Sequence, residues 1–95
     1  MNLKDLHTQE KPVSANSFFK SELGHVNAIQ ILQGGQLKEH ITKTTALLIC
    51  VEGKVVFENE KGIKETLLAG DFVAIEPMVK HWIDGVSDSQ LILIK

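Results

Sequence analysis

The chain is marked by short apolar runs in which hydrophobic and polar residues tend to alternate with a period of two. Runs of about four to eight residues that are rich in Val, Ile, Leu and Phe are typical of β-strands. Gly, Asn, Asp and Pro separate them at short, fairly regular intervals. The runs cover residues 26–32, 46–53, 54–60, 63–77 and 89–95. This pattern predicts an all-β fold, either an antiparallel sandwich or a barrel.

Two glycine-containing segments are the clearest turn signals. Residues 59–62, with the sequence Asn-Glu-Lys-Gly, join two of the runs. Gly62 can take the positive φ angle that closes a hairpin with a bulge. Gly70 and Asp71 divide the long run of residues 63–77 in the same way. We therefore expect a turn at each of these two places.

The first 25 residues have a weaker pattern. Residues 2–7 predict one helical turn, and residues 17–20 favour a strand over a second helical turn. We expect a single domain, in which residues 1–25 form an N-terminal segment with a helical turn and an added strand. Residues 26–95 then form the barrel itself.

Composition places the chain in the ordinary globular class and narrows its partners. The 95 residues are 43% hydrophobic and 23% charged, with a formal net charge of −2. Basic residues are scattered among acidic ones, so we expect no nucleic-acid partner. The longest apolar run, residues 46–51, falls short of the roughly 20 residues that span a bilayer. The N-terminus lacks the features of a signal peptide, so we expect a cytoplasmic protein with no membrane partner.

Six residues have the spacing of a two-part sequence motif: Gly35, His40, Gly53, Gly70, Pro77 and His81. In its first part the stretch GGQLKEH ends at His40, and a Glu-Gly turn closes the part at Gly53. In its second part the stretch GDFVAIEPMVKH runs from Gly70 to His81. With these motifs, residues 26–95 resemble the small single-domain cupins. The resemblance implies a cupin-type antiparallel β-barrel or jelly roll, also called a double-stranded β-helix, in which His40 and His81 converge.

The departures from the cupin pattern concern the metal site. In metal-binding cupins, three histidines and a glutamate hold a divalent first-row transition metal. Here Thr42 stands at the second histidine position, Ala46 at the glutamate position, and Met78 replaces a motif glycine. Two of the four ligand positions remain, whereas a catalytic site of this kind needs at least three protein ligands. The motif is degenerate, and we expect no cofactor; a metal, if bound, would be held by His40 and His81.

Strand alternation suggests what such a site could hold instead. If His40 points inward, continued alternation turns Thr42, Ala46, Leu48 and Cys50 to the same side. The row has a polar mouth and an apolar floor, which is typical of pockets for small organic ligands. We therefore predict a ligand site at the barrel mouth, formed by His40, Thr42, Leu48 and His81.

The remaining polar residues have simpler interpretations. His7 and His25 are expected at the surface, and Glu76 and Asp84 match no motif position. Cys50 is the single cysteine and lies within an apolar run, so it is predicted to be a buried, unreactive thiol. No residue is identified as catalytic.

Aromatic residues outside the predicted core favour self-association. Trp82 follows His81 directly, so it should face away from the interior. An outward tryptophan, together with Phe18 and Phe19, could cover a subunit interface. The small core and the tendency of cupins to form oligomers also favour self-association, and we expect a homodimer.

Three functions remain open at this point. The first is a non-catalytic module that binds an unknown small molecule at the barrel mouth. The second is a metal-dependent cupin enzyme of the isomerase, lyase or dioxygenase type that uses His40 and His81. The third is a structural or oligomerising barrel without a ligand, with both histidines simply hydrogen-bonded at strand ends. Because two ligand positions are lost, the sequence favours the first, although cupins host many different activities.

Overall fold

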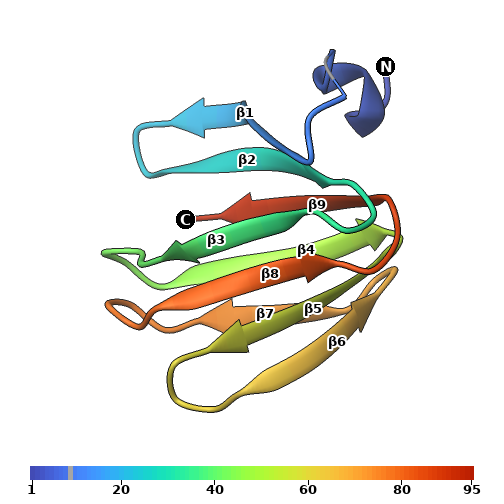
Figure 1. The fold of residues 1–95 in the computed structure, drawn as a ribbon. Helices are drawn as coiled ribbons and strands as arrows, with labels where there is room; N and C mark the ends of the chain where they lie inside the picture. Colours follow the sequence, from blue (N-terminus) through green and yellow to red (C-terminus); the bar gives the residue numbers. More distant parts are fainter. Residues whose placement is uncertain (9) are drawn as a thin grey trace.

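A computed structural model describes residues 1–8 and 10–95 of the chain. Nearly all of its regular structure is β-strand, as the sequence pattern predicted (Figure 1). One 3₁₀ turn, η1, spans Leu3–Leu6. The strands are β1 Val13–Ser21, β2 Gly24–Ile31, β3 Gln36–His40, β4 Ala46–Glu52, β5 Lys54–Asn59, β6 Lys64–Leu68, β7 Phe72–Ile75, β8 His81–Gly85 and β9 Ser89–Ile94.

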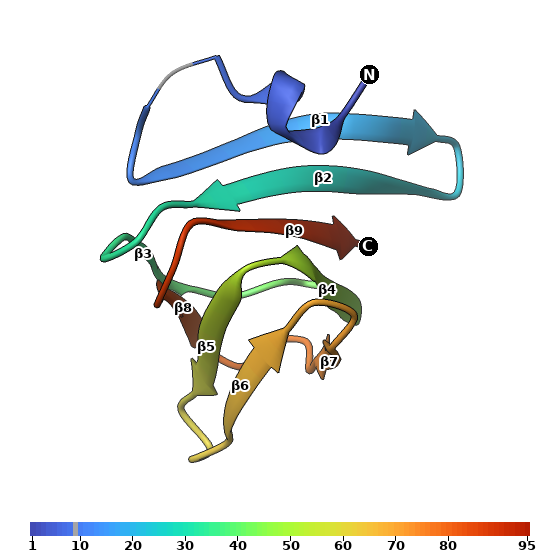
Figure 2. The same cartoon turned by 90° about the vertical axis from the view of Figure 1, so that its right-hand side faces the viewer.

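The strands form two antiparallel sheets. One has five strands in the order β1-β2-β9-β4-β7, and the other has four in the order β3-β8-β5-β6. Seen from the side, the two sheets form separate layers joined by loops at their ends (Figure 2). This arrangement is a jelly roll, which confirms the predicted fold class.

The core lies between the two sheets and is filled by alternate residues of both. Leu48, Val55 and Leu91 are completely buried, and Phe57 and Ile83 are nearly so. The neighbours of these residues along each strand face outward, as the pleat of a strand requires. The apolar alternation in the sequence therefore identifies the inward-facing rows.

The two predicted turns lie where expected. Gly62 has a φ angle of 90° in the hairpin between β5 and β6, and Gly70 has a φ angle of 91° between β6 and β7. The side chain of Asn59 stabilises the first turn, because its Oδ1 atom accepts hydrogen bonds from the backbone of Lys61 and Ile63. Both turns thus use a left-handed glycine, the residue that takes this conformation without strain.

The N-terminal segment contributes to the same five-stranded sheet. The helical turn expected over residues 2–7 is η1, and Asn2 caps it by accepting a hydrogen bond from the backbone of Lys4. The expected strand over residues 17–20 lies within the longer β1, which pairs along its length with β2. Asn16 joins the two elements by donating a hydrogen bond to the carbonyl of Leu6 at 2.6 Å.

Strands β3 and β8 were not recognised as apolar runs in the sequence. Gln36–His40 is mostly exposed, with a half-buried Leu37, so the alternation is weak there. The β8 strand, His81–Gly85, begins with a buried polar residue rather than an apolar one. These two strands pair with each other, and they carry the two motif histidines.

Candidate functional site

His40 and His81 are brought together by the pairing of β3 with β8. His40 is the last residue of β3 and His81 the first of β8, and their Cα atoms are direct partners in the register. Their Nε2 atoms lie 3.0 Å apart. The rings meet edge to face, with centroids 4.1 Å apart and an interplanar angle of 60°. The predicted convergence of the two histidines is therefore confirmed.

Backbone carbonyls fix the other nitrogen of each ring. Nδ1 of His40 lies 3.0 Å from the carbonyl oxygen of Lys38, and Nδ1 of His81 lies 3.3 Å from that of Val79. A carbonyl oxygen only accepts, so each Nδ1 carries a hydrogen and donates it. The two Nε2 atoms therefore face each other, and one of them must be protonated for a hydrogen bond to form between them.

The number of protons on the pair sets what it can bind. With both rings neutral, the two Nε2 atoms present lone pairs to the same point. With one further proton, the pair is satisfied by its own Nε2–H···Nε2 hydrogen bond. With both Nε2 atoms protonated, the pair carries two positive charges and two converging donors, which suit an anion.

Burial makes the two rings unequal. His81 is 1% exposed and stacks on Phe57, with ring centroids 5.7 Å apart, whereas His40 is only half-buried. Burial lowers the pKa of His81, the positive charge of His40 lowers it further, and the Val79 carbonyl partly opposes both effects. His81 therefore holds a proton on its Nε2 atom less readily than an exposed histidine does.

Thr42 lies in the loop between β3 and β4, within the first part of the motif. Its backbone carbonyl accepts a hydrogen bond from the backbone of Met78 at 2.8 Å. Its side chain is 4% exposed, and its Oγ1 atom lacks a hydrogen-bond partner among the described residues. Met78 has a φ angle of 63°, so this chain adopts a left-handed conformation at the position of the motif glycine.

The prediction that residues from His40 to Cys50 form one continuous inward-facing row is wrong. His40 ends β3 in the four-stranded sheet, whereas Ala46 begins β4 in the five-stranded sheet, so the chain changes sheet between them. Ala46, Leu48 and Cys50 do face the interior, but for a different reason: alternation within β4 alone. The residues of the first part of the motif are therefore divided between the two sheets.

Leu48 does not form the floor of an open pocket. It is completely buried within the hydrophobic core cluster. The main cavities, with volumes from about 230 to 580 Å³, are lined by other residues than His40, Thr42, Leu48 and His81. The part of the site that faces solvent is the exposed side of His40, and Leu48 acts as a packing residue.

The donor set does not fit the four-ligand metal site of metal-binding cupins. Ala46 offers no donor atom, and Thr42 offers only a neutral hydroxyl. Within residues 1–8 and 10–95, no group of three or more His, Cys, Asp or Glu side chains is placed to hold an ion. Of the four ligand positions, only the two imidazoles of His40 and His81 remain.

Residues that matched no motif position have structural partners. Nε2 of His25 lies 3.1 Å from Oδ1 of Asn27, and the carboxylate of Asp84 accepts a hydrogen bond from Gln36. His7 is less exposed than expected, because its Nδ1 lies 2.8 Å from the hydroxyl of Ser14. Burial lowers the pKa of His7.

The single thiol is buried as predicted. Cys50 is completely buried, and its Sγ atom lies 3.6 Å from the carbonyl oxygen of Glu52. Burial raises the pKa of this thiol, and the negative charge of Asp71 raises it further. The thiolate form is therefore disfavoured, which leaves Cys50 unreactive.

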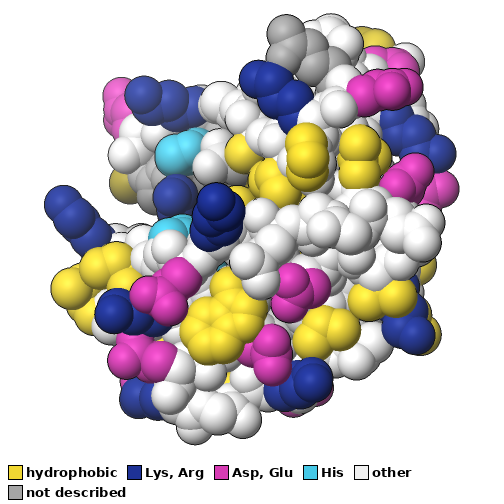
Figure 3. All heavy atoms as spheres, viewed as in Figure 1, with side chains coloured by type: hydrophobic (Ala, Val, Ile, Leu, Met, Phe, Trp, Pro, Cys, Tyr) yellow, Lys and Arg dark blue, Asp and Glu magenta, His cyan; other side chains and the backbone are white. Residues whose placement is uncertain are grey.

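Lysines near the histidine pair were not singled out in the sequence. Lys38, Lys43 and Lys80 lie within three residues of His40 or His81 along the chain, and Lys80 pairs with Glu39 at 3.6 Å. Lysine side chains gather beside histidine at one end of the visible face (Figure 3). The signal that could have identified them is the excess of lysine over acidic residues in residues 38–43 and 78–81.

Comparisons with known proteins identify the fold. No protein-family model and no curated protein sequence matches the chain. A cupin superfamily protein from Desulfitobacterium hafniense is 16% identical, with a TM-score of 0.85 over 98% of this chain and 84% of that chain. A cupin-2 domain containing protein from Shewanella frigidimarina is 18% identical, with a TM-score of 0.79 over 100% of this chain and 92% of that chain. KdgF from Halomonas sp. is 18% identical, with a TM-score of 0.78 over 87% of this chain and 76% of that chain.

Proposed function

Because this chain has the cupin fold but keeps only His40 and His81 of the metal-binding motif, we propose that it is a non-catalytic module that binds a small anionic molecule. The ligand, for example a carboxylate, is held at the histidine pair. The observation that carries the proposal is the pair itself: the facing Nε2 atoms lie 3.0 Å apart, and among the described residues no third His, Cys, Asp or Glu side chain is placed with them to hold a metal.

The charges around the pair favour an anion over a cation. Lys38, Lys43 and Lys80 outnumber the one acidic residue, Glu39, in the two segments that carry the histidines. Protonation of both Nε2 atoms adds two converging donors at the same end of the molecule. An anion then receives charge-assisted hydrogen bonds, which are stronger than those between neutral groups.

The two alternative functions are less well supported. A metal-dependent cupin enzyme would need a third ligand, and the described residues bring none to the pair. A purely structural barrel agrees with the closed interior beneath Leu48. It assigns no ligand to Thr42, whose buried hydroxyl lacks a partner among the described residues and is satisfied either by a ligand or by an ordered water.

A ligand test follows from the proton count on the pair. We expect succinate or phosphate to raise the thermal midpoint of the protein at pH 6, and to do so much less at pH 8, because anion binding requires protonated Nε2 atoms. Neutral succinamide should have no effect at either pH. Differential scanning fluorimetry and histidine NMR shifts measure both.

Two histidine variants distinguish binding of succinate at this site from a general effect of salt on stability. The His40→Ala variant should lose the succinate effect, whereas His25→Ala, a histidine elsewhere on the surface, should keep it. Protection that is unchanged in His40→Ala would contradict the proposal.

Metal content tests the enzyme alternative directly. We expect much less than one equivalent of Mn, Fe, Co, Ni, Cu or Zn in protein purified without a metal-chelating tag. Added chelator should leave the thermal midpoint unchanged, because the remaining two imidazoles are a poor metal site. Stoichiometric metal that is lost in both His40→Ala and His81→Ala would favour the enzyme instead.

The stability of the fold should fall at mildly acidic pH because of His81. The folded chain lowers the pKa of this group below its ordinary value of 6.5. The unfolded chain then binds more protons than the folded chain in this range, so the contribution is complete above pH 6.5 and is lost as the pH falls through the folded pKa. Urea unfolding at several pH values should show this loss in the wild type and in His25→Gln. In His81→Gln the part of the slope due to His81 should disappear, which leaves the contribution of His7, whose pKa burial also lowers. An unchanged slope would show that another group is responsible.

A further inference from the structure

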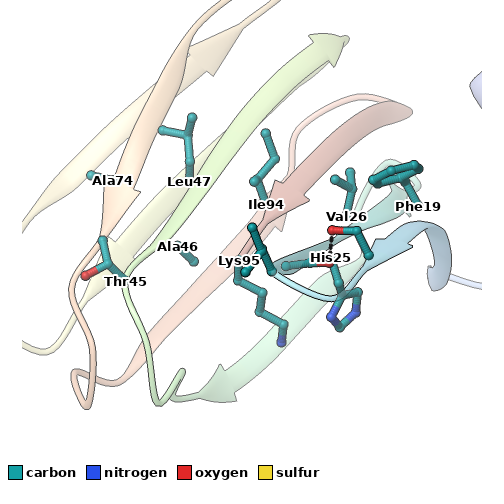
Figure 4. A pocket seen from close by; sticks show the side chains of 12 residues that line it. Phe19, His25, Val26, Thr45, Ala46, Leu47, Ala74, Ile94 and Lys95 are labelled. Carbon is teal, nitrogen blue, oxygen red and sulfur yellow. Dashed lines mark hydrogen bonds between the residues drawn. The ribbon is translucent and has the colours of Figure 1, made fainter.

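The outer face of the five-stranded sheet changes from apolar to polar along its three middle strands, β2, β9 and β4. At one end of these strands a shallow apolar groove is lined by a row of paired residues, Val26, Ile94 and Leu47 (Figure 4). Toward the other end the strands carry a second row of paired residues, Gln30, Gln90 and Glu52. A row of two amides and a carboxylate therefore crosses the sheet away from the groove.

Glu52 belongs to this row because of a bulge in β4. Cys50, two residues earlier, is buried in the core, so strict alternation would turn Glu52 inward as well. The register of β4 against β9 instead shifts by one residue between Cys50 and Glu52. The extra residue brings the Glu52 carboxylate to the outer face. Bulges re-aim side chains in this way and are frequent beside active sites.

A polar hollow lies over the row. It consists of two adjoining cavities of about 290 and 310 Å³, and both are lined by Lys4, Glu52 and Gln90. Lys4 belongs to η1, and its Nζ atom lies 3.0 Å from Oε2 of Glu52. Glu52 and Gln90 belong to the sheet, whereas Lys4 does not. The Lys4 side chain can therefore leave the hollow without opening the sheet.

Gln90 carries an acceptor that the chain leaves unused. The residue is 6% exposed, and its Nε2 atom donates a hydrogen bond to Oε1 of Gln30 at 2.7 Å. Its own Oε1 atom is buried and has no hydrogen-bond partner in residues 1–8 and 10–95. The ammonium of Lys4, although it pairs with Glu52, makes no hydrogen bond to this oxygen. A buried acceptor without a donor destabilises the fold, and a donor brought to it recovers that cost.

The larger cavity contains a second carboxylate. Besides the three shared residues, its lining consists of Gln30, Leu32 and Asp88. Oδ1 of Asp88 accepts a hydrogen bond from the backbone of Gln33 at 2.8 Å, which holds this side chain in place. The lining thus has two carboxylates and one ammonium, an excess of negative charge, and Leu32 adds apolar surface. These groups suit a cation with an apolar stem better than an anion.

We propose that the larger cavity binds a short aliphatic diamine. One ammonium group replaces that of Lys4 on Glu52 and also donates a hydrogen bond to Oε1 of Gln90. The second ammonium group pairs with Asp88, and the methylene chain lies against Leu32. An ammonium group has three donors and no acceptor, which matches a lining of two carboxylates and an unused carbonyl oxygen. Lys4 acts as a competitor that is part of the chain itself.

Titration with putrescine tests the proposal. At low ionic strength and millimolar concentration, putrescine should shift the NMR signals of the side-chain amide of Gln90. Butanediol, which has the same chain length and no charge, should leave these signals unchanged. Butylamine should bind more weakly than putrescine, because it has one ammonium group for the two carboxylates.

Removal of the internal competitor gives the most specific result. Lys4→Ala should bind putrescine about 2- to 5-fold more tightly, which corresponds to the loss of one weak exposed ion pair. Lys20→Ala removes an exposed lysine from β1 and should leave the affinity unchanged.

Removal of each carboxylate identifies its partner. Glu52→Gln should weaken putrescine binding about 10-fold or more, because a charge-assisted hydrogen bond is lost. Glu65→Gln, at an exposed carboxylate of β6, should bind as the wild type does. Asp88→Asn should reduce the affinity for putrescine to that for butylamine. Circular dichroism identifies any variant that has failed to fold.

The histidine pair provides an independent control, because His40 and His81 lie in the other sheet. His40→Ala should lose the succinate effect and keep putrescine binding. Three outcomes would overturn the diamine site: no change at Gln90 with millimolar putrescine, equal affinity in Glu52→Gln and Glu65→Gln, and weaker binding in Lys4→Ala than in the wild type.

Discussion

Replacing Leu48 by alanine should lower the free energy of unfolding by about 2 to 5 kcal/mol, the range for buried Leu→Ala changes. The side chain of Leu48 is completely buried on β4 and belongs to the core between the two sheets. Its removal takes away apolar contacts and leaves a cavity that neighbouring strands fill only in part. Because small domains are stabilised by about 5 to 15 kcal/mol, such a loss removes a large part of the total. Urea denaturation followed by circular dichroism measures it.

The matched control is Leu68→Ala. Leu68 lies at the end of β6 and is 51% exposed, so the same chemical change there should cost less than about 1 kcal/mol. The comparison also bears on the site. If Leu48 contacted a ligand rather than the core, its replacement would weaken the response to succinate and change the unfolding free energy little. The opposite result is expected.

Replacing Gly53 by alanine should cost about 2 to 5 kcal/mol, from backbone strain of about 1 to 2 kcal/mol and steric overlap of about 1 to 3 kcal/mol. Gly53 joins β4 to β5 with a φ angle of 94°. A Cβ atom built there would lie 2.8 Å from the Cα atom of Ser89, and closer still to the carbonyl oxygen of Asp88. Backbone atoms of the neighbouring turn cannot move aside as a flexible side chain would. Thermal and urea unfolding both report the loss.

Gly62→Ala separates the two causes. Gly62 has nearly the same φ angle, 90°, but no atom lies within 4 Å of a Cβ built there. Only the strain of the left-handed conformation remains, about 1 to 2 kcal/mol. Equal losses in the two variants would mean that the overlap at Gly53 is relieved by movement of the Ser89 turn.

Local sequence signals were sufficient for the parts of the fold that depend on local physics. The turn at Gly62 follows from a left-handed glycine after an asparagine that can bond the turn backbone, and both features are visible in four residues. Strands β4, β5 and β9 carry strong alternation because each has one face in the core. The jelly roll follows from these strands together with the resemblance to cupins.

Strands β3 and β8 show where such signals fail. Gln36–His40 is polar on both sides and exposed over most of its length. What makes it a strand is its pairing with β8, which is distant in sequence. Pairing of this kind leaves little local signature, since the hydrogen bonds are made by the backbone whatever the side chains.

The sequence identified the residues of the site better than it predicted their geometry. Motif spacing brought His40 and His81 together, but the facing of their Nε2 atoms depends on the carbonyls that hold each Nδ1. Extending the alternation of one strand through Thr42 to Leu48 missed the change of sheet between them. An alternation argument holds only as long as the chain stays in one strand.

The buried thiol of Cys50 can report how often the five-stranded sheet opens around it. The cysteine lies on β4, which pairs with both β9 and β7 in the five-stranded sheet. Under native conditions a thiol reagent can reach it only in those molecules whose β4 has transiently separated from the core. The labelling rate, followed by mass spectrometry without any introduced cysteine, therefore measures rare open states that equilibrium spectra do not register. Its dependence on urea distinguishes a local release of the sheet from unfolding of the whole domain.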